Sequence, residues 1–161
     1  LPNPFSSTLK LKVDYPSITL SRYINVTMTE FSLRAQEKIA ITRLRLKNNG
    51  TLGDSSFLKL ELVDSQFGNV LTATSIVING YVEFLLTPNT AKANKGVMVS
   101  GGTYAIQGDI LTPNTTEKPK IRWDIVSASD ISAFDFDDLT RVASLTPSMT
   151  FPIEGPTITT F

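Results

Sequence analysis

The sequence contains neither cysteine nor histidine, and these two absences remove much of the common catalytic and metal-binding chemistry. Without cysteine, the chain forms no disulfide bond and offers no thiolate to a metal or a substrate. Without histidine, the serine–histidine–aspartate arrangement is impossible, and zinc lacks its most common nitrogen ligand. A glycosidase needs two carboxylates across a sugar-sized cleft, for which a compact domain of this length offers little room. We therefore expect that the protein is not an enzyme.

The sequence also has no formal net charge and no long apolar runs. Its 15 lysine and arginine residues balance 15 aspartate and glutamate residues, and no long basic run occurs. Binding to nucleic acid, or electrostatic docking on a membrane, usually depends on an excess of positive charge, so we expect neither. Apolar runs such as residues 76–78 and 97–99 are far too short to span a bilayer, so we expect no membrane insertion.

What the sequence does contain is a succession of short, strand-like segments. With 161 residues, of which 41% are hydrophobic, it is long enough for one domain with a real core. Apolar and polar residues alternate along residues 58–62 and 121–125, as they do in strands with one buried face. Asn79-Gly80 favours a tight type I′ hairpin turn. These features predict an all-β fold, an antiparallel Ig-like or jelly-roll-like β-sandwich with little or no helix.

The same alternation predicts which side chains form the core. Along residues 24–29, the apolar side chains occupy every second position. Between residues 38 and 46 the alternation changes phase, which predicts a β-bulge or a strand that switches sheets. We expect the following residues to be mostly buried: Leu9, Leu11, Ile24, Val26, Leu44, Leu46, Leu60, Phe84, Ile106, Trp123 and Ile125.

An ordered series of stretches resembles a known kind of module. The stretches are FSLRA, KIAITRLRLKNNGT, LKLELVDSQFGNVL, NGYVEFLL, VSGGTYAIQGDI, IRWDIVSASDI and FPIEGPTIT. In this order they resemble the Ig-like β-sandwich repeat of bacterial surface-layer and cell-surface proteins. The resemblance lies in patterned strands and turns, and it implies a single sandwich domain over residues 8–161. It also implies a structural or adhesive role and provides no catalytic residue.

Four aspartates fall within residues 130–139, and they raise the question of a metal site. Asp135, Asp137 and Asp138 are close enough in sequence to share one ion, and Asp130 is a further candidate ligand. Carboxylate oxygens in a loop between strands suit calcium, although the spacing does not fit an EF-hand. The alternative is a polar loop whose aspartates stay in solvent. Calcium is the one cofactor that the sequence suggests, and the solvated loop is the interpretation that we favour.

Two further patterns concern the attachment and the binding of carbohydrate. Asn25, Asn49 and Asn114 each begin a glycosylation sequon, and the last two fall in predicted turns. Tryptophan often stacks against sugars, but Trp123 alternates in phase with Ile121 and Ile125, which favours a packed core position. Glycan is therefore a weak candidate partner.

The first residues suggest a mode of assembly. Residues 1–4 contain two prolines, which cannot donate to a ladder, and residues 7–13 form an amphipathic strand with Leu9, Leu11 and Val13 on one face. Such a segment can pair with its own sheet or with that of a neighbour. We therefore predict that residues 1–13 are an extended segment and strand that either completes the next copy as a donor strand or serves as an ordinary first strand.

Three classes of function remain open from the sequence. The first is a structural subunit of a filament or surface layer that assembles with copies of itself by sheet-edge or donor-strand pairing. The second is an adhesive or glycan-binding module of a larger surface protein, and the third is a viral capsid or decoration protein. The sequence begins at Leu1 without a leader. From this we expect a processed extracellular or cell-surface protein, or an excerpt of one.

Overall fold

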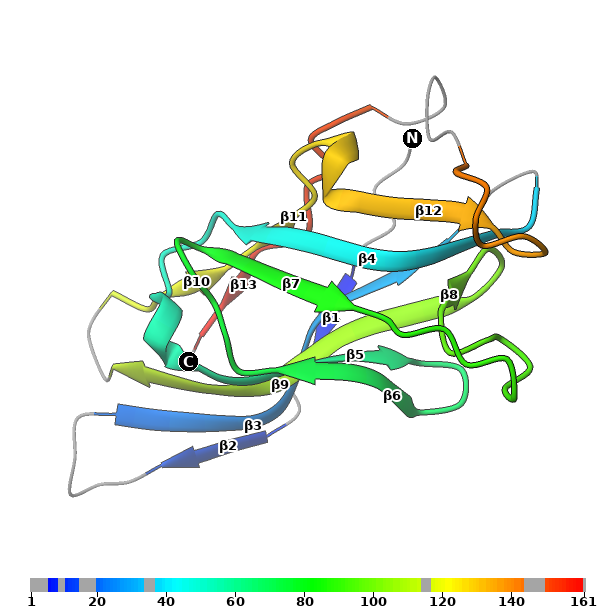
Figure 1. The fold of residues 1–161 in the computed structure, drawn as a ribbon. Helices are drawn as coiled ribbons and strands as arrows, with labels where there is room; N and C mark the ends of the chain where they lie inside the picture. Colours follow the sequence, from blue (N-terminus) through cyan, green and yellow to red (C-terminus); the bar gives the residue numbers. More distant parts are fainter. Residues whose placement is uncertain are drawn as a thin grey trace.

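The protein is an all-β sandwich in which two antiparallel sheets pack face to face (Figure 1). The computed structural model describes residues 6–8, 11–14, 20–33, 37–113, 117–143 and 150–160. Within these residues, helical structure is limited to two single-turn 3-10 helices, η1 (Asp54–Ser56) and η2 (Ala128–Asp130). The predicted fold class is confirmed.

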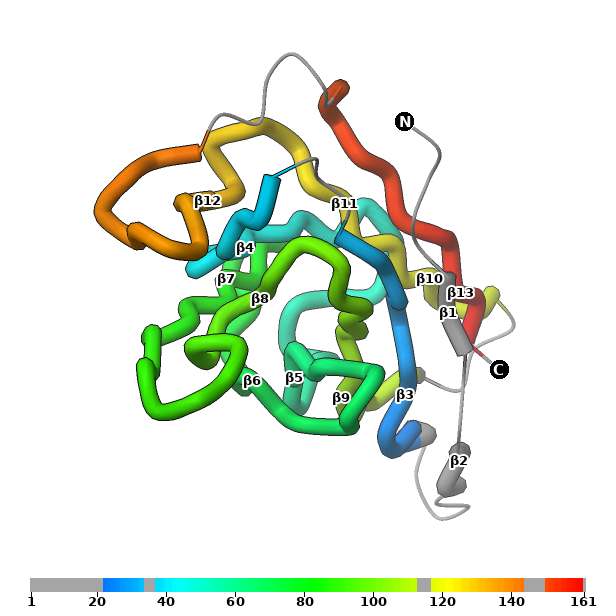
Figure 2. Tube along the Cα trace, turned by 90° about the vertical axis from the view of Figure 1, so that its right-hand side faces the viewer, coloured from blue at the N-terminus to red at the C-terminus, as the bar shows by residue number. Residues whose placement is uncertain are grey.

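The first sheet is built around two long strands that pair along most of their length. β3 (Leu20–Ser32) and β9 (Thr103–Pro113) lie at its centre. β5 (Phe57–Asp64) and then β6 (Asn69–Thr74) follow beyond β9, while β1 (Ser6–Thr8) and β2 (Leu11–Asp14) both pair with the far side of β3. The order across the sheet is therefore β1-β3-β9-β5-β6. Figure 2 shows β9 and β5 between β3 and β6.

The second sheet is organised around β4 (Ile39–Asn48). β7 (Tyr81–Leu85) and β8 (Met98–Val99) pair with one side of β4. β11 (Trp123–Asp124) and β12 (Ile131–Asp135) pair with its other side. A separate short pair joins β10 (Lys120–Ile121) to β13 (Ile158–Thr159), so that the last described segment is bound to the rest of the domain.

Most of the predicted core residues lie in the interface between the two sheets. Ile24 is only half-buried, and the side chains of Leu9 and Leu11 lie outside the described residues. The prediction is confirmed for Val26, Leu44, Leu46, Leu60, Phe84, Ile106, Trp123 and Ile125.

The strict alternation predicted for residues 24–29 is wrong. The pairing of β3 with β9 shifts register twice, first between Tyr23 and Val26 and then between Thr27 and Thr29. Asn25 adopts a φ of 54° at the first shift, the left-handed region that asparagine tolerates better than most residues. The extra residue at the second shift changes the face to which the following side chains point, so Thr29 pairs with core residue Ile106 and is fully buried although a regular strand would expose it. Thr27 is buried as well, on the outer side of the sheet, where it pairs with Gln107.

Two local predictions are confirmed. Asn79 and Gly80 have φ values of 52° and 81°, and the backbones of Ile78 and Tyr81 exchange two hydrogen bonds, as a two-residue type I′ turn requires. The change of phase within residues 38–46 is a β-bulge, because the pairing of β4 with β12 shifts register between Ile41 and Arg43.

Tyr104 closes one end of the sandwich. Its hydroxyl accepts a hydrogen bond of 2.7 Å from the backbone N–H of Val99, five residues earlier in the chain. The ring lies over Gly102, where a Cβ atom would come within 2.6 Å of the hydroxyl oxygen. Burial raises the pKa of the Tyr104 hydroxyl. The arrangement resembles the tyrosine corner of immunoglobulin-like sandwiches, in which a tyrosine near the start of a strand bonds to the backbone upstream.

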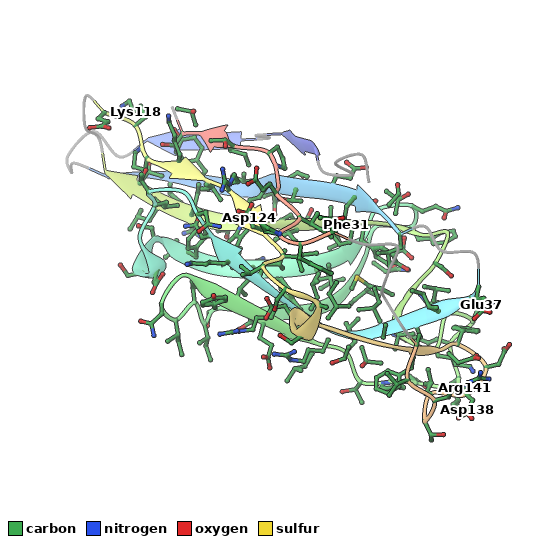
Figure 3. The ribbon with its side chains drawn as sticks, turned by 90° about the horizontal axis from the view of Figure 1, so that it is seen from above. Phe31, Glu37, Lys118, Asp124, Asp138 and Arg141 are labelled. Carbon is green, nitrogen blue, oxygen red and sulfur yellow. The ribbon has the colours of Figure 1, made fainter. Side chains whose placement is uncertain are left out.

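Asp124 is almost fully buried. One carboxylate oxygen accepts hydrogen bonds from the Arg122 guanidinium, at 3.0 and 3.2 Å, and from the Asn49 side-chain amide at 2.6 Å. The other oxygen accepts from the backbone N–H of Gly155 at 3.0 Å. Figure 3 shows Asp124 among the strands in the interior of the molecule.

The contacts of Asp124 join three segments that are distant in sequence. Asn49 follows β4, Arg122 lies between β10 and β11, and Gly155 belongs to the last segment. Residue 155 must be glycine, because a Cβ atom there would collide with the backbone carbonyl of Trp123. Asn48 supports the same corner, since its side chain bonds to the backbone N–H of Gly50 and Arg122 and to the carbonyl of Leu52. A buried charge is stable only when it is paired in this way.

Asp124→Ala is expected to lower the free energy of unfolding by about 3 kcal/mol, because it leaves a buried backbone donor and the Asn49 amide without an acceptor. The measurement is urea denaturation followed by tryptophan fluorescence. Asp137→Ala, at an exposed aspartate, is the matched control and is expected to change stability little. Equal stability of the two variants would contradict the role assigned to Asp124.

Tyr104→Phe is expected to lower stability by about 1–3 kcal/mol, because the buried N–H of Val99 loses its acceptor. Tyr81→Phe, at the surface, is the control. The folded protein retains the Tyr104 proton more tightly than the unfolded chain does. Its contribution is therefore complete below the ordinary pKa of 10.0 and is lost as pH rises above it. Denaturation curves of the Phe variant that coincide with those of the original protein would refute this account.

Candidate assembly edge

The four aspartates of residues 130–139 do not form a common ligand set. The Asp130 carboxylate is buried and accepts bonds from the Ser127 backbone and from Arg45. Asp135 accepts the backbone N–H of Asp137 at 2.8 Å. Within the described parts of the chain, no group of three or more Asp or Glu residues is placed to hold a metal ion. Calcium binding by Asp135, Asp137 and Asp138 therefore stays a prediction without a formed site.

Asp138 has a local structural role instead. Its carboxylate accepts bonds from both the backbone N–H and the hydroxyl of Thr140, at 3.1 and 2.6 Å. These bonds lower the pKa of the Asp138 carboxyl. Figure 3 places Asp138 and Arg141 together at one end of the molecule, far from Asp124. The carboxylates of this loop thus stabilise turns.

The sequons and the tryptophan have different environments. Asn25 is exposed at the bulge in β3, whereas the amide nitrogen of Asn49, the atom that would carry a glycan, is bonded to buried Asp124. Asn114 lies outside the described residues. Trp123 is fully buried, with its indole N–H 3.3 Å from the Met28 sulfur and its ring 5.0 Å from that of Phe57. Trp123 is therefore a core residue.

The predicted assembly strand is paired within its own chain in this structure. β1 and β2 are both antiparallel to β3, with Leu11 opposite Ile24 and Val13 opposite Arg22. Leu9 lies outside the described residues. The single chain thus shows the ordinary first-strand arrangement, and it leaves open what the outer edge of this segment contacts in an assembly.

At the opposite edge of the first sheet, β6 pairs only with β5 among the described strands. A strand at a sheet edge presents unpaired N–H and C=O groups, and monomeric proteins usually protect such an edge with lysine, proline or an inward-pointing charge. Residues 69–78 contain none of these. Instead, Val70, Ile76 and Ile78 are 49%, 62% and 63% exposed. We call β6 with these three side chains the open edge.

The other strand edges are better protected. Beyond β12, the backbones of Arg141 and Ala143 bond to those of Asp135 and Ala133. β7 carries Glu83, whose carboxylate is held by Arg43 at 3.0 Å. β2 carries Lys12. The open edge is therefore the part of the described surface best suited to pair with another strand.

A shallow hollow of about 400 Å³ adjoins the open edge where β6 ends. Ile76 and Ile78 line one wall, and Arg45 and Tyr81 line another. The Arg45 guanidinium lies 3.8 Å from the centre of the Tyr81 ring, so a cation already covers one face of that ring. A sugar therefore cannot stack on that face, and the hollow fits apolar side chains better.

Comparison with family models, with curated proteins and with solved structures finds no significant match for this chain. Among the residues that the structure describes, no helix is long and apolar enough to cross a membrane. The candidate site thus depends on the geometry of the sheets alone.

Sequence reasoning missed the open edge, although a signal was present. Residues 69–78 form a ten-residue stretch without a charge or a proline, longer than a buried strand needs. The position of β6 at an edge depends on pairing with β5 and β9, and the alternation of side chains does not report the order of strands in a sheet.

Removal of divalent cations is expected to leave the melting temperature unchanged, because the loop aspartates already accept bonds from the protein. Circular dichroism melts with EDTA and with excess calcium provide the test. A higher melting temperature in calcium that Asp137→Ala abolishes would instead establish a calcium site in this loop.

Proposed function

We propose that this protein is a structural subunit of an extracellular or cell-surface assembly, a filament or a surface layer, in which identical copies join along their sheet edges. The observation that carries the proposal is the open edge, in which an uncharged strand pairs with a described strand on one side only and exposed aliphatic side chains lie beside it. The resemblance to surface-layer repeats supports the same conclusion.

The energetics favour assembly that depends on concentration. Full burial of a valine or isoleucine side chain contributes about 1.5–3 kcal/mol, so the three partly exposed side chains of the open edge supply a few kcal/mol at most. Ladder hydrogen bonds add about 0.5–1.5 kcal/mol each. Against this, association costs at least about 4 kcal/mol of translational and rotational freedom. A single contact of this kind is weak, and many repeated contacts at high local concentration are needed for a stable assembly.

Electrostatics do not oppose this association. The formal net charge is zero, so copies of the chain do not repel one another through their overall charge. The open edge itself carries no charge that would have to be desolvated. We therefore expect the assembly to tolerate high salt, since apolar contacts and backbone hydrogen bonds are little affected by ionic screening.

Val70→Lys is expected to abolish assembly, because a lysine in β6 provides the edge protection that this strand lacks. Sedimentation velocity and electron microscopy over a series of protein concentrations measure the loss. Val142→Lys is the control, since Val142 is a still more exposed valine that lies outside the open edge, and it is expected to assemble like the original protein.

Two outcomes would contradict the proposal. One is a protein that stays monodisperse at every concentration, and glycan binding by that monomer would favour the adhesive alternative. The other is assembly that Val142→Lys disrupts and Val70→Lys does not, which would place the contact between copies elsewhere on the surface.

A further inference from the structure

We propose that the open edge accepts β1 of the next copy, in parallel orientation, so that the first sheet continues from one copy to the next. The inference rests on the proposed function and adds the identity of the pairing strand, its direction and its register. It follows from the backbone pairing of the first sheet, which relates the two edge strands to each other.

The two edge strands of the first sheet, β1 and β6, are connected by the same rows of paired residues. One continuous row of paired residues runs across the sheet through Ser6, Glu30, Ala105, Val63 and Val70. It begins in β1 and ends in β6. A neighbouring copy that is displaced across the strands and rotated to follow the twist of the sheet, without a shift along the strands, therefore places its β1 beside the β6 of the first copy.

A second row confirms that this match is not limited to one position. It runs through Thr8, Thr27, Gln107, Glu61 and Ala73. β1 thus lies at the same level as the central part of β6. β2 pairs with residues 21–24 of β3, which lie beyond the level at which β6 ends. β1 is therefore the strand whose rows coincide with those of the open edge.

The direction of pairing follows from the number of antiparallel steps. Four antiparallel pairings separate β1 from β6, so both strands run in the same direction within one copy. A displaced neighbour keeps this direction, and its β1 therefore runs parallel to the open edge. Parallel ladders are slightly less stable per residue than antiparallel ones, but they are regular and continuous.

Antiparallel pairing of the same two strands would require the neighbour to be turned over. Leu60 and Leu62 are core residues, so their partners in β6, Thr74 and Thr72, lie on the core side of the sheet, and Ala73 lies on the outer side. Turning the neighbour over would join the core side of one sheet to the outer side of the next. Simple displacement keeps the core sides continuous, and it is the arrangement that we propose.

Pairing of β6 with the β6 of a second copy would be a third arrangement. Such a contact has two-fold symmetry and uses both open edges, so it closes a dimer and stops growth. Pairing of β1 with β6 leaves one free edge of each kind at the ends, so copies add without limit. This arrangement therefore explains the polymer that the proposed function requires.

Engineered cysteines test the register directly, because the chain has no cysteine of its own. Ser6→Cys and Val70→Cys in one chain lie on opposite edges and cannot form a disulfide within one copy, whereas paired strands bring Cα atoms within the range that a disulfide spans. Under mild oxidation at assembling concentration, we expect most chains of this double variant to run as a ladder of covalent multimers on a non-reducing gel.

Two control pairs separate the alternatives. Ser6→Cys with Thr72→Cys is expected to give no ladder, because Thr72 lies on the core side of the sheet and the row of Ser6 on the outer side. A ladder from this pair alone would establish the turned-over arrangement, in which the outer side of one copy continues the core side of the next. Ser6→Cys with Glu30→Cys is expected to form disulfides within one chain only. Intermolecular disulfides in that pair would show that β1 leaves its own β3 and joins the β3 of a neighbour by strand exchange. Either result would overturn the inference.

Failure of the inference is distinguishable from failure of the proposed function. Polymers that electron microscopy detects for the original protein, but that show no ladder in the Ser6→Cys, Val70→Cys variant, would refute pairing of β1 with β6 and leave the structural role intact. Absence of polymers at every concentration of the original protein would refute both.

Discussion

The fold depends on a buried carboxylate. Asp124 joins the end of β4, the strand β11 and the last described segment through four hydrogen bonds, and none of these segments is adjacent to another in sequence. Because an unpaired buried charge is costly, an arrangement that separated these segments would leave Asp124 short of hydrogen-bond partners. The network therefore favours the observed arrangement of the three segments, in which Trp123 lies in the core.

Whereas Asp124 and Tyr104 are buried and hydrogen-bonded, one edge of the first sheet has no partner strand among the described residues. Sandwiches differ from barrels in having such edges, and proteins that stay monomeric protect them. Residues 141–143 cover part of β12, whereas β6 is uncharged and flanked by exposed aliphatic side chains. The account of function depends on this contrast between edges.

The sequence predicted features that arise from local patterning. Alternation placed Trp123, Leu60 and Leu46 in the core, and Asn79-Gly80 identified a turn whose two residues adopt positive φ. Features that depend on pairing between distant strands were not predictable in the same way. The bulges of β3 have no periodic signal, and Asp124 appears in sequence as one polar residue among others, because its partner Gly155 is 31 positions away.

The candidate site shows the same difference between features that follow from local sequence and features that follow from pairing of distant strands. Residues 130–139 attracted a metal hypothesis because aspartates that are close in sequence are easy to recognise, but their carboxylates bond to the adjacent backbone. The open edge was harder to recognise, because it is defined by the lack of a described partner strand on the outer side of β6. Whether a strand lies at an edge depends on the order of strands in the sheet, and that order follows from the pairing of β5, β9 and β3 with one another.

Amide hydrogen exchange compared between dilute and assembled protein tests the central claim most directly. If copies join along the open edge, the amides of residues 69–74 that face away from β5 exchange rapidly in the dilute protein and become protected on assembly. Amides in the loop at residues 87–93 are expected to exchange at the same rate in both states. Protection that appears elsewhere while β6 exchanges unchanged would contradict the account.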